Sequence, residues 1–303
     1  MDTEYIVTDE VKKLWATEIE IYKYFDAFCK KHNFKYYAVG GTALGAARHK
    51  GFIPWDDDMD FVMFHEDYQR FLELGAKEFT YPYFLASHIT DPVNGGITTS
   101  RLRRLDTTAC SKWEYDYIVS SGNCDYKLGI WIDILPLSYI PEDEETRVVQ
   151  RAQIMDVWKA VRGFNALQAV NANNDNFNHE YLNYIDDFKR YNEKYSIGEI
   201  KQLYLDLCGQ KKEPNKFVGV TALRTFLPKL IWETKWFEST VDMPFEDITV
   251  PCPVGWNEML TRQYGDWRIP VRNLAFHEIY KFNADIPYKE MFKEFYKTET
   301  NQG

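Results

Sequence analysis

The stretch that most constrains the fold spans residues 40–64 and reads GGTALGAARHKGFIPWDDDMDFVMF. The aromatic and β-branched run at 36–39 that precedes it predicts a short buried strand. Gly40 and Gly41 then allow the backbone to turn and to approach a ligand closely. Thr42 predicts the cap of a short helix that begins at the next residue, with its free N–H groups directed into the turn. This order of elements favours a phosphate-binding site.

Four aspartates follow this helix, at the mouth of a second, otherwise apolar strand. Because side chains alternate along a strand, Asp58 and Asp60 are predicted to share one face. Two neighbouring carboxylates repel each other unless a cation lies between them, and hard oxygen ligands suit Mg²⁺ or Mn²⁺. Asp56 is in register with this pair, whereas Asp57 points away and is predicted to be structural. The glycine turn and the D-x-D pair together predict a site for a metal-bound nucleotide phosphate.

A further acid, Asp133, interrupts the apolar run GIWIDILPL at 129–137. A carboxylate in such a strand is costly to bury unless it is paired or holds a metal. A salt bridge to a nearby arginine is the alternative explanation. Metal binding is favoured, because the D-x-D pair needs another ligand. Pro136 and Pro141 are expected to end this part of the sheet.

Arginines recur within residues 98–108, a segment whose alternation predicts a strand. Arg101 and Arg103 would share one face, opposite Leu102 and Arg104. Near a phosphate site the two arginines on the shared face could bind anions. A solvated strand face explains them equally well, so both interpretations stay open.

The composition limits the classes of protein that this chain can belong to. It has 303 residues, 45% of them hydrophobic, which is enough for one large domain or two closely packed ones. The formal net charge of −10 disfavours a broad nucleic-acid footprint. No apolar run has membrane-spanning length, and the first ten residues do not resemble a signal sequence. Five scattered cysteines without a C-x-x-C pair predict reduced thiols in a cytosolic protein.

Periodicity and turn signals predict the remaining elements. Helices are expected at 8–28, 65–79, 144–168, 180–195, 197–208, 255–264 and 286–296, and strands at 83–88 and within 235–253. No low-complexity linker borders the helical middle, so its helices are expected to pack onto the sheet rather than form an independent domain.

The motif GGTALGAARHKGFIPWDDDMD resembles the LicD family of phosphocholine transferases, which also includes fukutin and the fukutin-related protein. Looser matches are GIWIDILPL and the C-terminal stretch FEDITVPCPVGWNEMLTRQYGDWRIP. The resemblance implies an α+β, nucleotidyltransferase-like fold, a small mixed β-sheet flanked by helices. It divides the chain into a catalytic core (1–141), a helical region packed on it (142–235) and a C-terminal closing segment (236–303) that completes the same domain.

The resemblance also implies roles for particular residues, in three sets. The glycine turn that cradles the nucleotide phosphates corresponds to Gly40, Gly41 and Thr42. The three metal-binding carboxylates correspond to Asp58, Asp60 and Asp133, of which Asp133 could also accept the acceptor's proton. The basic step between turn and acids corresponds to Arg48, His49 and Lys50, with Arg48 stabilising phosphate charge; Arg101 and Arg103 are further candidates for substrate binding.

The activity implied is Mg²⁺-dependent (or Mn²⁺-dependent) transfer of a phospho-substituent from a CDP-linked donor such as CDP-choline, with release of CMP. The acceptor would be a hydroxyl of a cell-surface glycan such as lipopolysaccharide or teichoic acid, lipid-linked or free. Such a protein would work in the cytoplasm at the inner face of the membrane, without a membrane span and without nucleic acid. Two alternatives are a nucleotidyltransferase that moves AMP or CMP, and a non-catalytic nucleotide-binding protein. A metal-dependent nuclease fits the acidic charge least.

Overall fold

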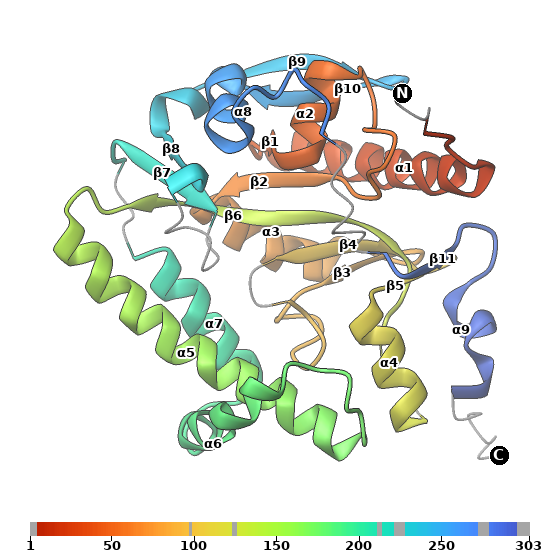
Figure 1. Ribbon diagram of the computed structural model, residues 1–303, viewed down its shortest axis with the longest axis vertical. Helices are drawn as coiled ribbons and strands as arrows, with labels where there is room; N and C mark the ends of the chain where they lie inside the picture. The colour runs from red at the N-terminus through yellow and green to blue at the C-terminus, as the bar shows by residue number, and fades with distance from the viewer. Residues whose placement is uncertain are drawn as a thin grey trace.

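A mixed sheet forms the centre of the molecule (Figure 1). The computed structural model describes residues 5–96, 99–122, 126–210, 214–220, 228–271 and 279–295. The strand order is β1-β2-β6-β4-β3, and β7 extends the sheet by pairing with β6 and with β8. Strands β2 and β6 run parallel, whereas the other pairs in the sheet are antiparallel. Helices flank this sheet, so the predicted α+β class is confirmed.

The seven strands of the main sheet differ greatly in length. They are β1 Tyr37–Ala38, β2 Asp60–Phe64, β3 Tyr83–Ala86, β4 Ser100–Arg104, β6 Ile130–Ile140, β7 Phe217–Val220 and β8 Ile231–Glu233. Two antiparallel pairs stand apart from it: β9 Thr240–Phe245 with β10 Ile248–Pro253, and β5 Thr108–Cys110 with β11 Lys281–Asn283.

Helices precede and follow the strands along the described part of the chain. The α-helices are α1 Asp9–His32, α2 Gly40–Arg48, α3 His65–Glu78, α4 Lys112–Ser121, α5 Glu144–Asn171, α6 Ile185–Asn192, α7 Ile197–Cys208, α8 Trp256–Tyr264 and α9 Tyr288–Met291. Short 3-10 helices are η1 His179–Tyr184, η3 Pro228–Leu230, η4 Thr234–Phe237 and η5 Lys293–Phe295.

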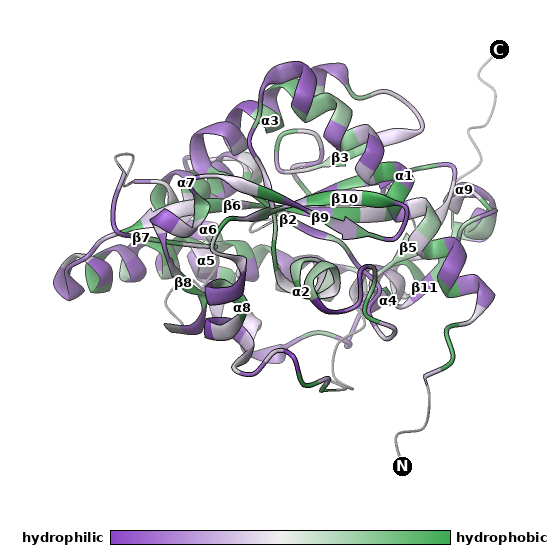
Figure 2. Ribbon diagram, turned by 90° about the horizontal axis from the view of Figure 1, so that it is seen from above, coloured by the Kyte–Doolittle hydropathy of each residue, from purple (hydrophilic) through white to green (hydrophobic). Residues whose placement is uncertain are grey.

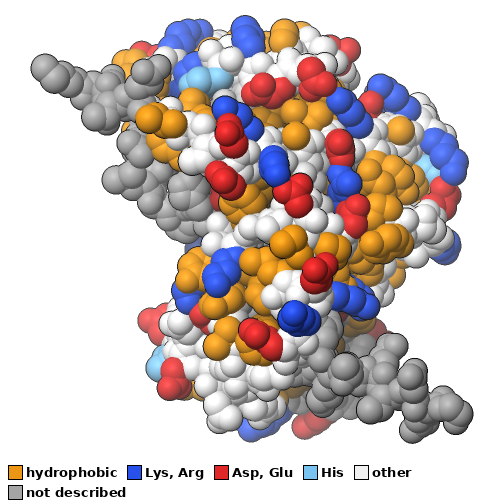
Figure 3. All heavy atoms as spheres, turned by 90° about the vertical axis from the view of Figure 1, so that its right-hand side faces the viewer, with side chains coloured by type: hydrophobic (Ala, Val, Ile, Leu, Met, Phe, Trp, Pro, Cys, Tyr) orange, Lys and Arg blue, Asp and Glu red, His pale blue; other side chains and the backbone are white. Residues whose placement is uncertain are grey.

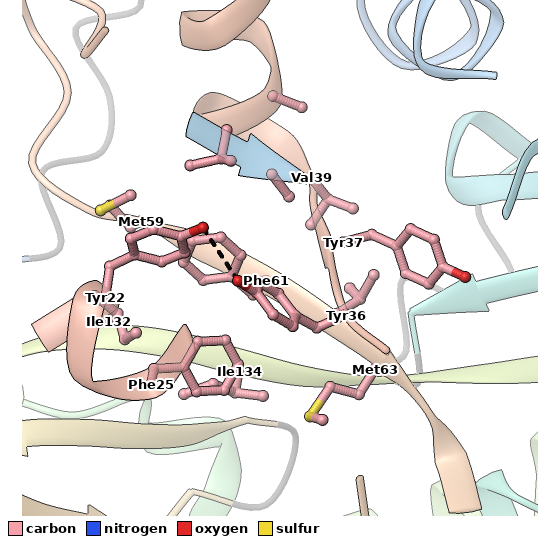
Figure 4. Packing of buried hydrophobic residues seen from close by; sticks show 14 of the residues in the cluster. Tyr22, Phe25, Tyr36, Tyr37, Val39, Met59, Phe61, Met63, Ile132 and Ile134 are labelled. Carbon is pink, nitrogen blue, oxygen red and sulfur yellow. Dashed lines mark hydrogen bonds between the residues drawn. The ribbon is translucent and has the colours of Figure 1, made fainter. Parts of the chain in front are cut away.

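Helix α1 covers one face of the sheet with aromatic side chains. It begins at the predicted cap, where the Thr8 hydroxyl accepts the N–H of Val11 at 3.3 Å. Figure 4 shows Tyr22 and Phe25 of α1 packed on Phe61 of β2, with ring centroids 5.1 Å and 5.6 Å from Phe61. Because side chains alternate along a strand, the neighbours of Phe61 in β2 face away from α1. The first of these neighbours is Asp60.

The two faces of the sheet carry different helices. Rings of α1 and α3 touch, as in the pair Phe25 and Phe71 at 5.6 Å, so these two helices lie on the same face. Figure 2 shows α3 on one side of the central strands and α2 and α8 on the other, with hydrophobic residues concentrated in the strands. Helix α2, which begins with the glycine pair, therefore borders the face opposite α1.

The helical middle has an apolar core of its own, formed by α5, α6 and α7, with Val157 and Tyr204 among its buried members. Helix α7 reaches the loop after β3, where His88 and Gln202 are hydrogen-bonded at 2.7 Å. The region is not wholly helical as predicted, because β7 and β8 come from it and extend the central sheet. The predicted division into 1–141, 142–235 and 236–303 stays a prediction.

Two further expectations need correction. Strand β6 continues through Pro136 to Ile140. The proline is tolerated because β4 pairs with β6 only up to Ile134 and β7 pairs only from Leu137, so the missing N–H removes no bond to either strand. The expected tail helix is the short α9 followed by η5, and Tyr296 lies outside the described residues.

The described residues also show how the charged side chains and the cysteines are placed. On the face drawn in Figure 3, acidic and basic side chains of the described residues are intermixed rather than gathered by sign. None of the helices in the described ranges is long and apolar enough to cross a membrane. Four cysteines, Cys29, Cys110, Cys208 and Cys252, are buried and free, and Cys124 lies outside the described residues.

Candidate active site

Three aspartates meet on the sheet face opposite α1. Asp60 of β2 is directly opposite Asp133 of β6 in the parallel register, and Asp58 precedes β2 by two residues. One carboxylate oxygen from each lies within 4.8 Å of the others. The alternation of the D-x-D pair and the neighbouring position of Asp133 are therefore as predicted; their role as metal ligands stays a prediction.

The glycine pair runs directly over these acids. Gly40 has a left-handed φ of +57°, and a Cβ there would lie 3.0 Å from Oδ2 of Asp60. At Gly41 an added Cβ would lie 2.3 Å from Oδ2 of Asp56, which is far closer than atoms can approach. Glycine is favoured at Gly40 by its left-handed φ, and at Gly41 an added Cβ would force the Asp56 carboxylate to shift. This packing brings the N-terminus of α2 to the carboxylates.

The start of α2 corrects one prediction. The helix begins at Gly40, so Thr42 lies inside the first turn and does not cap it. The Thr42 hydroxyl instead accepts the backbone N–H of Asp60 at 2.7 Å. No side-chain cap satisfies the first N–H groups of α2 from its N-cap residue, Val39. Thr42 thus joins the first turn of α2 to the start of β2.

The carboxylates of these aspartates repel one another. Burial first, and then the charges of Asp60, Asp56, Asp133 and Asp57, raise the pKa of Asp58 well above its ordinary value. Asp56, Asp57 and Asp58 form a second group with oxygens within 4.8 Å. A bound cation would favour the ionised carboxylates. An all-oxygen donor set of this kind fits Mg²⁺ or Mn²⁺.

Asp133 has two hydrogen-bond donors in addition to its carboxylate neighbours. Its Oδ1 accepts Nε of Arg101 at 3.2 Å, and its Oδ2 accepts the indole N–H of Trp131 at 3.1 Å. Arg101 also lies over the Trp131 ring at 4.3 Å. The salt bridge that was the alternative explanation for Asp133 is therefore present. Metal binding, the favoured explanation, stays a prediction, and Asp133 lies in the acidic group that could provide it.

The contacts of Arg103 differ from those expected of a substrate-binding residue. As predicted, it shares a face with Arg101, because both lie over Trp131, while Arg104 pairs with Glu20 of α1 on the other side. However, Arg103 is only 3% exposed and donates to Oε1 of Glu114 at 2.6 Å. Its other terminal nitrogen faces backbone carbonyls. Its terminal nitrogens are thus used internally, and only Nε lacks a partner among the described residues.

The basic residues predicted between the glycine turn and the acids, Arg48 to Lys50, lie at the C-terminal end of α2. Arg48 donates to the carbonyl of Trp267 at 2.7 Å, so it joins α2 to the segment after α8, and burial lowers its pKa. His49 contacts the Trp55 ring edge-on at 6.3 Å, and burial followed by the Arg48 charge lowers its pKa. Lys50 is exposed and donates to the carbonyl of Ala47. It follows the C-terminal end of α2, which is about 13 Å along the helix axis from the first turn of that helix beside the acids. Substrate contact by these three residues stays a prediction.

Two residues near the site, Tyr264 and Glu18, were not predicted as site residues from the sequence. Desolvation of its hydroxyl, and then the charges of Asp60, Asp56 and Asp58, raise the pKa of Tyr264, although the side chain as a whole is 43% exposed. Its signal was its place in the C-terminal stretch that resembles the LicD family. Glu18 of α1 is fully buried beside the acids, and a carboxylate within an apolar helix face was its signal.

Asp57 has a structural contact, but it does not point away from the other acids as predicted, because its carboxylate lies within 4.8 Å of those of Asp56 and Asp58. Its Oδ2 accepts the backbone N–H of Ile279 at 3.2 Å. Trp15 of α1 donates its indole N–H to the carbonyl of Asp56 at 3.0 Å. Helix α1 and the segment before β11 therefore hold the acidic loop from two sides.

Comparison with known proteins supports the motif that organises this site. Residues 33–116 match the family model described as LicD/FKTN/FKRP, nucleotidyltransferase domain. The matched segment is thus similar to proteins of the LicD family. It contains the glycine turn, the D-x-D pair and Arg101, while Asp133 lies beyond the matched range.

Three relatives are similar to parts of this chain. The lipopolysaccharide cholinephosphotransferase LicD of Haemophilus influenzae is 48% identical over 73 residues, covering 22% of this chain and 28% of the relative. An uncharacterized protein of Rickettsia typhi is 50% identical over 44 residues, 14% of each chain. One of Rickettsia prowazekii is 57% identical over 37 residues, 12% of this chain and 14% of the relative. The matches thus span less than a third of each relative's length.

Proposed function

We propose that this protein is a metal-dependent phosphotransferase that moves a phospho-substituent from a CDP-linked donor to a hydroxyl of a cell-surface glycan. The observation that carries the proposal is the meeting of Asp58, Asp60 and Asp133 under the Gly40-Gly41 turn. The name of the Haemophilus relative favours phosphocholine as the transferred group and lipopolysaccharide as the acceptor. CDP-choline as the donor is a further part of the proposal. Work in the cytoplasm at the inner face of the membrane is part of this proposal.

Asp58, Asp60 and Asp133 would hold Mg²⁺ or Mn²⁺. When bound, such a cation neutralises charge on a diphosphate and so lowers the barrier to breaking it. The acceptor oxygen would attack the phosphorus that carries the alcohol, while the bond from that phosphorus to the bridging oxygen breaks and CMP leaves with the electron pair. Asp133 would take the proton of the acceptor hydroxyl.

Neighbouring groups of the chain would orient the reactants. The first turn of α2 would offer backbone N–H donors to the donor's phosphate oxygens, and the absence of side chains at Gly40 and Gly41 would allow this approach. The bonds from Arg101 and Trp131 hold the Asp133 carboxylate in one orientation. Arg48 would add positive charge at the edge of the site.

The test is release of CMP by the purified protein with Mg²⁺, a panel of CDP-linked donors (choline, ribitol, glycerol and ethanolamine) and lipopolysaccharide as acceptor. The expected result is release from one donor that stops with EDTA. Asp58→Asn should lower the rate by at least about 100-fold, with a melting temperature that does not fall. Asp186→Asn, at an exposed position of α6, is the matched control.

Other outcomes would replace the proposal. Normal CMP release by Asp58→Asn would remove the carboxylates from the mechanism. Pyrophosphate release from CTP or ATP, without consumption of any CDP-linked donor, would assign the site to nucleotidyl transfer. Nucleotide binding without turnover of any substrate would favour a non-catalytic protein.

A further inference from the structure

A cavity of about 300 Å³ lies next to the acidic site, between β4 and the helical middle. Its floor includes Arg101 and Arg103, and its walls come from α4, α5, α7 and the loop between β3 and β4. Arg101 belongs to both places, since it lines the cavity and donates to Asp133. The volume is at the lower end of the range typical of small-molecule sites, roughly 300–1,000 Å³.

Positive charge dominates this cavity although the chain as a whole carries −10. Its lining includes four cationic side chains, Arg101, Arg103, Arg162 and Lys201, and the single carboxylate of Glu114. Glu114 is paired with Arg103 at 2.6 Å. A surplus of cations in a concave site attracts anions, because low-dielectric walls strengthen the local field.

Lys201 of α7 contributes a fixed positive charge. Its ammonium donates to the carbonyls of Pro92, Val93 and Gly95 at 2.8, 3.1 and 2.7 Å, so its three protons are used to hold the loop. No carboxylate within the described residues forms a salt bridge with it. Burial lowers its pKa to about 8, so it is largely protonated at pH 7. The charge therefore stays in the cavity wall without a salt-bridge partner.

Arg162 of α5 is oriented by aromatic contacts rather than by an acid. Its guanidinium lies over the rings of Trp158 and Tyr181, at 5.1 and 5.5 Å. Its Nε is buried and lacks a hydrogen-bond partner among the described residues, as does Nε of Arg103. Buried donors in native proteins are nearly always satisfied. An oxygen-rich anion in the cavity would provide acceptors for the guanidinium of Arg162, which lines it.

We propose that this cavity binds a phosphate group of a reactant, with Arg162 and Asn165 of α5 as direct contacts and Lys201 as a fixed charge. The inference rests on the proposed function in that the phosphate belongs either to the nucleotide of the donor or to a phosphorylated sugar of the acceptor. The shared chemistry is a phosphate group with charged oxygens: in the donor it is part of the diphosphate and becomes the monoester of CMP on release, and in a phosphorylated sugar it is a monoester. The helical middle thereby gains a role in holding a substrate beside the acids.

The experiment is isothermal titration of the metal-free full chain in EDTA with inorganic phosphate, CMP and glucose 6-phosphate as probes. We expect saturable binding of at least one phosphate monoester that Arg162→Met weakens at least tenfold. Lys159→Met removes a cation from the same helix that contacts Tyr184 and does not line the cavity, so it should change affinity less than twofold. Binding of CMP would identify the donor as the source, and binding of glucose 6-phosphate the acceptor.

A second variant covers the case in which Arg162→Met lowers the melting temperature. Asn165→Phe fills the cavity from α5 and should abolish the same binding with Arg162 intact. Failure of all three probes to bind the wild-type chain, or equal binding by wild type, Arg162→Met and Asn165→Phe, would overturn the inference. Because EDTA removes the metal and no turnover is measured, these results are independent of the CMP-release test.

Discussion

Replacement of Glu18 by glutamine should make the metal-free protein more stable at neutral pH. Glu18 is 0% exposed, and neither of its carboxylate oxygens has a hydrogen-bond partner among the described residues. Burial first, and then the charges of Asp57, Asp56, Asp133 and Asp60, raise its pKa well above the ordinary value. Glutamine has the same shape without the charge, so the variant removes the electrostatic cost and keeps the packing.

The size of the effect has an upper bound set by proton uptake. A buried carboxylate can always escape its charge by binding a proton, and doing so at pH 7 costs about 1.4 kcal/mol for each pH unit above its ordinary pKa. That pKa is 4.5, so pH 7 lies about two and a half units above it. Glu18→Gln should therefore raise the free energy of unfolding by about 1–3 kcal/mol at pH 7.

The pH dependence has a definite sign. A raised pKa means that the folded state binds more protons than the unfolded state above pH 4.5, so the free energy of unfolding falls as the pH rises through this window. Below pH 4.5 the penalty is absent in the wild type as well. Asp58 has a shift of the same sign, but it is present in both proteins and cancels in the comparison.

Urea denaturation in EDTA at pH 4, 5, 6 and 7 measures the difference. The gain of Glu18→Gln over the wild type should be near zero at pH 4 and largest at pH 7. Glu73→Gln, at an exposed position of α3, should change the free energy of unfolding by less than about 0.5 kcal/mol at every pH. A gain that is absent at pH 7, or equal at all four pH values, would refute the assignment of Glu18 as a buried, unpaired acid.

Two further predictions concern the neighbourhood of the site. Glu114→Gln removes one partner of the buried pair with Arg103 and should lower the free energy of unfolding by about 3–5 kcal/mol in urea. Asp186→Asn breaks an exposed pair and should lower it by at most about 0.5 kcal/mol; equal losses would contradict the burial argument. Gly41→Ala would place a Cβ against Asp56, so Mn²⁺ affinity measured by titration should fall about tenfold, and unchanged affinity would show that the acidic loop adjusts freely.

Local patterns predicted much of this fold. The cap at Thr8 and the aromatic periodicity after it predicted α1, and the short helix before Gly265 was likewise expected. The glycine pair and the D-x-D motif are neighbours in sequence, so their alternation and turn geometry could be predicted before any tertiary contact was known. The strands β7 and β8 could not, because they are short and are stabilised by pairing with β6.

Tertiary structure decided which charged groups meet. The register of β2, β6 and β4 places Asp60, Asp133 and Arg101 in one row, and sequence patterns do not set a register between distant strands. From the sequence Arg103 was a candidate for substrate binding, whereas the tertiary structure pairs it with Glu114.

The sequence by itself determined the local chemistry of this protein: a glycine turn, a helix start and paired carboxylates within 25 residues, in a pattern shared with the LicD family. The tertiary structure decided the surroundings, such as Lys201 bound to the carbonyl of Gly95, 106 positions away. The physical reason is that burial and charge neighbours arise from packing between distant segments, and these determine whether a charged side chain is paired, stressed or open to a ligand.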